Sequence, residues 1–167
     1  MKTNKRSAKP LKSKAFSLIE MLVVLTIIAI LLTIAIPSSD GKVDKIRIRE
    51  TIKLISLYKD KIAEFYTVNG VFPESNEQAG IPEPEKIIGN YLSAVEIKKG
   101  GFHLLLGNKI SSKLQGKTLT IRPVFVPESL LSPISWICGY DAIPEGMESP
   151  TSNNTDIEKQ LLPLECL

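Results

Sequence analysis

The hydrophobic pattern opens with a long, nearly unbroken apolar segment. From Phe16 to Ile36 the chain has 21 residues, and Glu20 is the only charged one among them. As a helix, this segment would be roughly 32 Å long, close to the hydrocarbon thickness of a bilayer. The pattern predicts a membrane-length helix with a single acid near its start.

The next stretch has the period of an amphipathic helix. Its apolar residues recur at steps of three and four, which places them on one helix face: Ile48, Ile52, Ile55, Tyr58, Ile62 and Tyr66. We expect this helix over 38–68, with the pair Asn69-Gly70 ending it. Pro37 lies where the two helices would join, and a proline there removes a backbone hydrogen bond and kinks the rod.

Residues 69–92 break the helical period, because they are rich in proline, glycine, glutamate and asparagine. We expect a long irregular connection there, of the kind that usually forms an interface or carries function.

From 93 to 138 the period changes to two, the period of a half-buried strand. Four short segments alternate in this way, separated by turns such as Lys99-Gly100-Gly101, and Pro123 and Pro127 suggest strand ends or edges. Four strands in succession predict an antiparallel meander, so we expect an α+β fold with the amphipathic helix packed on the sheet.

The charge distribution separates the N-terminus from the rest. The net charge is +3, but six basic residues and no acid precede Phe16, which leaves 15 basic against 18 acidic residues in the remainder. Positive flanks stay cytoplasmic, so this leader predicts an internal N-terminus and places the rest of the chain outside. A body of net negative charge offers no general case for nucleic-acid binding.

One local cluster of basic residues keeps a second possibility open. Six of them fall within 25 residues that contain no acid: Lys98, Lys99, Lys109, Lys113, Lys117 and Arg122. If folding brought them into one stripe, they could contact DNA phosphates. DNA binding by a filament-surface protein is therefore the alternative function, although the overall charge does not support it.

Two cysteines stand in the C-terminal part, Cys138 and Cys166, with 27 residues between them. Outside the membrane the environment is oxidising, so we expect them to form a disulfide. A loop of that size would gain about 3.5 kcal/mol from closure. Without the bridge, we expect the Pro- and Gly-rich loop to hold little shape.

Nothing in the sequence indicates catalysis. His103 is the only histidine and lies among leucines in an expected strand, where a structural role is the simplest one. There is no Ser/His/Asp arrangement, no Gly-rich phosphate loop and no Cys/His metal cluster. We expect no cofactor, no metal and no enzymatic activity.

The start of the apolar segment does not fit an ordinary secretory signal. The segment exceeds the usual 7–15 residues, and its small residue, Ala15, precedes the run. The sequence Lys14-Ala15-Phe16-Ser17-Leu18-Ile19-Glu20-Met21 resembles the class III leader junction of type IV prepilins. That family usually has glycine where this chain has Ala15.

The resemblance implies a specific processing and assembly route. A prepilin peptidase would remove the leader, 1–15, by cutting after Ala15, and would methylate the new amino group of Phe16. Segment 16–37 would serve first as a transmembrane helix and then as the polymerisation helix. Glu20 would pair with the terminal amine of a neighbouring subunit in a dry bundle; the alternative is a solvated acid at the helix start.

The similarity to type IVa pilins continues along the chain. It implies that 38–167 is a globular head, in which 69–92 is the αβ-loop and 138–166 the disulfide-bounded D-region. The implied protein is anchored in the inner membrane and then assembles, with the pilus machinery, into an extracellular homopolymer. Such filaments support adhesion, twitching motility or DNA uptake.

Overall fold

The computed structural model describes residues 16–35 and 40–167, and the chain divides into two units, Met1–Ser38 and Ser39–Leu167. Helix α1, Leu18–Ala35, belongs to the first unit, and helix α2, Asp40–Asn69, opens the second. Pro37, the expected site of the kink, lies outside the described residues, as does Ala15.

Helix α1 is apolar on all its faces. Its large side chains from Leu18 to Leu32 are exposed, and Leu18 retains 86% of its accessible surface. A helix with no polar face normally has its whole circumference covered by protein or lipid. Within residues 16–35 and 40–167, no helix is both long enough and apolar enough to cross a membrane.

Helix α2 is amphipathic, as the sequence predicts. Ile48, Ile55 and Ile62 are completely buried, one every second turn, while Ile52 is only partly buried. The helix ends at Asn69, and Gly70 follows with a φ of +70° and donates its N–H to the carbonyl of Tyr66 at 2.8 Å. A glycine accepts this left-handed conformation without steric cost, which explains the sharp stop.

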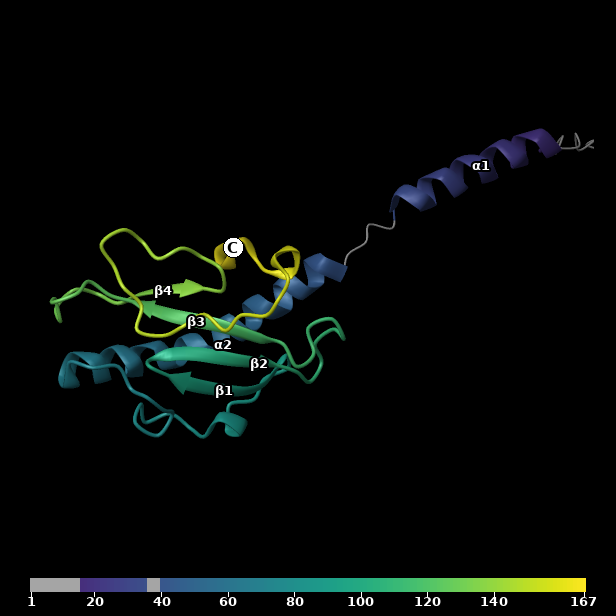
Figure 1. The fold of residues 1–167 in the computed structure, drawn as a ribbon. Helices are drawn as coiled ribbons and strands as arrows, with labels where there is room; N and C mark the ends of the chain where they lie inside the picture. Colours follow the sequence, from purple (N-terminus) through teal and green to yellow (C-terminus); the bar gives the residue numbers. More distant parts are fainter. Residues whose placement is uncertain (1–15, 36–39) are drawn as a thin grey trace, which may run out of the picture. The chain divides into compact units, whose positions relative to one another are not determined.

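The sheet is the expected four-stranded antiparallel meander, in the order β1-β2-β3-β4 (Figure 1). Its strands are β1 Leu92–Lys98, β2 Gly101–Leu106, β3 Thr118–Val124 and β4 Ser135–Cys138. Helix α2 runs along one face of this sheet. The expected α+β fold is therefore confirmed, and Pro123 lies one residue before the end of β3.

The hydrophobic core belongs entirely to the second unit, which we call the head. In the described part of the chain, the buried apolar residues run from Ile48 to Cys166, and none comes from α1. They fill the space between α2 and the sheet and include Phe102 and Leu104 of β2, both fully buried. Because a domain with its own core can fold by itself, the head does not depend on α1 for its packing.

Three short 3₁₀ helices complete the head. Pro84–Lys86 (η1) lies in the connection between α2 and β1, whereas Lys159–Leu161 (η2) and Leu164–Cys166 (η3) lie near the C-terminus. The segment between β4 and η3 first crosses the face of the sheet opposite α2 (Figure 1), and its later part, η2, contacts α2. Both faces of the sheet are thus partly covered.

Candidate functional site

Two residues that we expect to act in filament assembly, Phe16 and Glu20, lie close together in the described N-terminal segment. Phe16 and Ser17 precede α1, and Glu20 lies in its first turn. The carbonyl of Ser17 accepts the N–H groups of Glu20 at 3.1 Å and Met21 at 3.2 Å. A carboxylate in this position is favoured by the helix dipole.

Glu20 is also chemically distinct from the other polar residues of α1. The hydroxyl of Thr26 donates to the carbonyl of Val23 at 2.8 Å, and that of Thr33 donates to Ile30 at 2.7 Å. Within the described residues, the carboxylate of Glu20 has no hydrogen-bond or ion-pair partner. Among the polar side chains of α1, it is therefore the one available to a group outside these residues.

At the other end of the chain, the expected disulfide joins Cys138, the last residue of β4, to Cys166 in η3. Gly139 follows directly with a φ of +56°, and a Cβ there would lie 2.7 Å from the carbonyl oxygen of Cys166. Only glycine fits beside the bridge, because any side chain would collide with the backbone. The pairing of the two cysteines is confirmed.

The D-region is held by hydrogen bonds and buried side chains in addition to the disulfide. Thr120 in β3 donates its N–H to the hydroxyl of Thr155 at 3.0 Å, and its own hydroxyl accepts the N–H of Asn154 at 3.0 Å. Ile157 and Leu162 are buried in the core. The loop is anchored along its length because its backbone satisfies polar groups on the outer face of the sheet.

The C-terminal end is also tied to α2. Arg49 donates to both carboxylate oxygens of Glu165, at 2.7 and 3.0 Å. The hydrogen bond from Arg49 lowers the pKa of Glu165, with a smaller opposing effect from burial. This pair is solvent-exposed and fixes geometry more than it adds stability.

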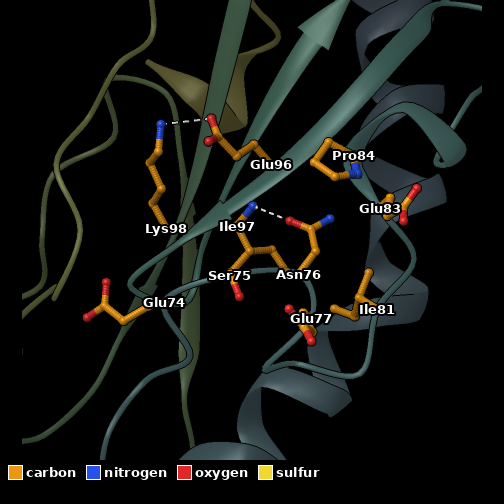
Figure 2. A pocket seen from close by; sticks show the side chains of 10 residues that line it. All are labelled: Glu74, Ser75, Asn76, Glu77, Ile81, Glu83, Pro84, Glu96, Ile97 and Lys98. Atoms are coloured by element: carbon orange, nitrogen blue, oxygen red, sulfur yellow. Dashed lines mark hydrogen bonds and ion pairs between the residues drawn. The ribbon is translucent and has the colours of Figure 1, made fainter.

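The αβ-loop is fixed to the free edge of β1 by one side chain (Figure 2). Asn76, 5% exposed, accepts the N–H of Ile97 at 2.8 Å and donates to the carbonyls of Val95 at 2.9 Å and Pro82 at 2.8 Å. Its amide therefore replaces a neighbouring strand at this edge. Unpaired strand edges invite pairing with other chains, and covering the edge prevents it.

Next to Asn76 lies an open groove of about 580 Å³, between the αβ-loop and β1 (Figure 2). Four carboxylates line it, from Glu74, Glu77, Glu83 and Glu96, and Lys98 is the only base among the lining residues. Lys98 lies 2.8 Å from Glu96. The groove can therefore attract a cationic group, but in the described part of the chain no cluster of His, Cys, Asp or Glu could hold a metal ion.

The structure does not bring the six expected DNA-contact residues into one stripe. Lys98 and Lys99 lie at the β1–β2 turn, whereas Lys109, Lys113 and Lys117 lie in or beside the β2–β3 loop. These turns are at opposite ends of β2, a strand of six residues or about 20 Å.

Two members of that set are also engaged within the head. The guanidinium of Arg122 donates to the carbonyls of Gly139 and Asp141, at 3.3 and 3.0 Å, and burial lowers its pKa. Lys117 lies 3.5 Å from Asp156. A continuous phosphate-binding track is not formed by these residues.

His103 is part of the sheet, in keeping with the structural role expected for it. It is buried on β2, where its Nδ1 lies 3.2 Å from the hydroxyl of Thr120 and its Nε2 has no hydrogen-bond partner. Burial lowers the pKa of His103, the charge of Lys98 lowers it further, and Glu96 on the neighbouring strand opposes both effects.

Sequence reasoning missed Asn76 and the pair formed by Thr120 and Thr155. Asn76 stands in a polar, irregular segment where nothing distinguishes an asparagine that binds a distant strand from one in a turn. The sequence did contain an indication for Thr120. A threonine hydroxyl on the outer face of a central strand needs hydrogen-bond partners if another segment covers it.

These features define a class of protein: a subunit with an apolar N-terminal helix and an α+β head closed by a C-terminal disulfide loop. Two family models match the chain. One, for pilin, a bacterial filament protein, matches residues 47–167, and one for the prokaryotic N-terminal methylation motif matches residues 10–36. The chain therefore belongs to the pilin family.

Individual relatives agree with this assignment. The type IV major pilin protein PilE of Neisseria gonorrhoeae is 26% identical over 159 residues, which cover 92% of this chain and 93% of that protein. The fimbrial protein EcpC of Eikenella corrodens is 29% identical over 145 residues, covering 84% and 91%. A fimbrial protein of Neisseria meningitidis serogroup B is 28% identical over 127 residues, covering 75% and 72%.

The resemblance to type IV pilins is thus confirmed, and the chain is a structural subunit of a pilus. The pilin family is not known to contain enzymes, which agrees with the expectation of a non-catalytic protein.

Proposed function

We propose that this pilin is inserted in the inner membrane through residues 16–36, is cut after Ala15 and N-methylated at Phe16, and then polymerises through its N-terminal helix. The observation that carries the proposal is the surface of α1. It is apolar on every side and exposed in the single chain, and its one unpartnered polar group is the carboxylate of Glu20. Such a helix needs lipid around it, or other helices.

The apolar surface of α1 would be covered first by lipid and then, in the filament, by other helices. In lipid, its apolar side chains and hydrogen-bonded threonines expose little polar surface, and Glu20 lies near the end of the segment, where a charge costs least. In a bundle of identical helices, the same side chains would pack against each other. Glu20 would then pair with the methylated amine of Phe16 on a neighbouring subunit, because opposite charges attract strongly where water is excluded.

Cleavage would create the cation that this pairing needs. Before cleavage, the nitrogen of Phe16 is part of a peptide bond and carries no charge. After cleavage, it is an amine with a pKa near 8, and it stays protonated at neutral pH. The removal of the leader therefore converts an isolated acid into half of a complementary pair, which explains why processing would precede assembly.

The filament would support adhesion, twitching motility or DNA uptake, together with the peptidase and the assembly machinery. The head's own role in DNA capture is the competing function. The geometry weighs against it, because the six basic residues are divided between opposite ends of β2 and several are paired.

Mass spectrometry of sheared filaments tests the proposal. We expect the dominant species to begin at Phe16, with a mass increase of one methyl group, and to retain the Cys138–Cys166 bridge. Filaments built from chains that still carry residues 1–15, or an amine of Phe16 without methylation, would contradict it. A soluble head compared in gel shifts over a range of salt concentrations separates the DNA function, which predicts salt-sensitive binding.

A further inference from the structure

The head has a basic end where α2 begins. The first two turns of α2 carry three basic residues, and the loop 107–117 carries three more: Lys42, Lys45, Arg47, Lys109, Lys113 and Lys117. The two segments are in contact, because the hydroxyl of Ser111 donates to the carboxylate of Asp44 at 2.9 Å. Val43, Arg47, Ser112 and Lys113 line the same hollow of about 310 Å³. We call the six basic residues Lys42, Lys45, Arg47, Lys109, Lys113 and Lys117 the basic end.

Acids from other elements lie beside this charge: Glu158 lines a hollow with Lys113 and Lys117, and Glu50 accepts from Asn90, whose carbonyl accepts the N–H of Lys109. Residues 40–47 contain only Asp40 and Asp44, and residues 107–117 contain no acid. Asp44 is 1% exposed and is already bound by Arg47 at 3.3 Å and by Ser111. Lys117 is partly neutralised by Asp156. The side chains of Lys42 and Lys109 are exposed.

The other end of the head has the opposite character. Residues 74–85 contain four glutamates and no base. This loop begins just after Phe72, which contacts the β1–β2 turn near the C-terminal end of α2. The loop does not stay at that end, because Glu85 lines a hollow with Ala94, Leu105 and Thr118, the residue after Lys117.

The position of the basic end along the chain indicates its partner. Only residues 36–39 separate Ala35 from Asp40, and a chain of that length spans at most about 18 Å. If residues 16–36 are inserted in the membrane, as proposed above, the beginning of α2 cannot leave the neighbourhood of the lipid surface.

We propose that the basic end binds the phosphate groups of anionic phospholipids while the subunit waits in the membrane before assembly. Lysine ammonium groups attract a negatively charged surface, and the attraction disappears within a screening length, so it acts only near the bilayer. The N-terminus of α2 adds a favourable dipole next to the same side chains. Contact with anionic lipid would hold this end of the head at the bilayer.

Site-resolved lysine labelling of the full chain tests this. The chain is reconstituted in nanodiscs of phosphatidylcholine alone or mixed equally with phosphatidylglycerol, and an amine-acylating reagent is read out by mass spectrometry. We expect phosphatidylglycerol to reduce labelling of Lys42, Lys45 and Lys109 by about threefold in low salt and to have little effect in high salt. Labelling of Lys61 and Lys99, exposed toward the other end of the head, should not change.

Paired variants provide the control. Lys42→Gln with Lys109→Gln should abolish most of the protection of Lys45, whereas Lys61→Gln with Lys99→Gln removes the same charge elsewhere and should preserve it. Equal protection of Lys45 in both variants would overturn the assignment to the basic end.

The remaining outcomes are distinct. Equal labelling in both lipids, with the chain inserted, overturns this inference and leaves the proposed filament function intact. Protection by a DNA duplex but not by phosphatidylglycerol assigns the surface to nucleic acid instead. Protection that depends only on the number of chains per disc assigns it to a second copy. If the chain inserts into neither kind of nanodisc, it has no membrane-bound state before assembly, and this inference is overturned.

Discussion

Asn76 and Ile97 are joined by a hydrogen bond of 2.8 Å that fixes the αβ-loop to the open edge of the sheet. The amide of Asn76 also reaches the carbonyl of Val95, so one side chain satisfies both a donor and an acceptor of β1. An edge strand whose backbone is satisfied in this way is not available to another chain. This polar contact adds to the burial of Phe72, Ile81 and Ile87, which anchor the same loop in the core.

We expect Asn76→Ala to lower the free energy of unfolding of the head by about 1–3 kcal/mol, because it leaves buried backbone groups without partners. Urea denaturation measures this. Asn76→Asp keeps the size and an acceptor but loses both donated bonds, so it should also destabilise the head. Ser75→Ala, next to it in the loop, should have little effect. A neutral result for Asn76→Ala would show that the loop is held by other contacts.

Removing the disulfide should separate global stability from local order. Replacing Cys138 and Cys166 with serine should cost about 3.5 kcal/mol if loop closure dominates. Under conditions where the variant remains folded, we expect the amides of Thr120 and Asn154 to stay protected from hydrogen exchange, because their partners are hydroxyl groups and not the bridge. Loss of protection at both amides in the folded variant would contradict the independent anchoring of the D-region.

Glu20→Ala should impair filament growth without preventing cleavage. The methylated amine of Phe16 would then be buried without a counter-charge, and breaking such a pair costs about 3–5 kcal/mol. Thr33→Ala is a matched control, because the hydroxyl of Thr33 bonds only to its own helix. Counting filaments by electron microscopy, with mass spectrometry of the processed subunit, gives both results. Normal filament numbers for Glu20→Ala would remove the pairing role.

The stability of the head should depend on His103 below neutral pH. Burial lowers the pKa of His103 in the folded head, and the unfolded value is about 6.5. The unfolded chain therefore binds more protons at pH values just below 6.5, so stability falls as the pH decreases through that window. We expect His103→Gln to flatten this part of the curve of urea midpoint against pH.

A second titration should appear at lower pH. The pKa of Glu165 is lowered by the hydrogen bond from Arg49, so its contribution is present above the unfolded pKa and is lost as the pH falls below it. Glu165→Gln should lower the urea midpoint by a constant amount above about pH 4.5 and change the slope of the curve only below that pH. A change in slope near pH 6 in Glu165→Gln would mean that the two titrations are wrongly assigned.

Much of the fold could be predicted from residue periodicity. The step of three and four located α2 because Ile48, Ile55 and Ile62 must share one face to reach the core, and the step of two located the strands. The disulfide could be predicted because only two cysteines are present. These are local patterns, and each needs only near neighbours in sequence.

Contacts between distant segments could not be predicted in the same way. Asn76 and Ile97 are 21 residues apart, and Thr120 and Thr155 are 35 apart. Whether polar residues so far apart meet depends on how the loops pass over the sheet, and composition does not encode that. The same applies to the basic residues. Lys99 and Lys109 are close in sequence, but they lie at opposite ends of β2, and the sequence pattern does not indicate this separation.

The separation of the core from α1 has a consequence for how a subunit changes its surroundings. Every buried apolar residue in the described part belongs to the head, so the core of the head would stay intact if α1 exchanged lipid for other helices, as proposed above. The free-energy cost and gain of such a transfer would fall on the 18 residues of α1. A folded head could then enter a filament, and return to the bilayer, without refolding.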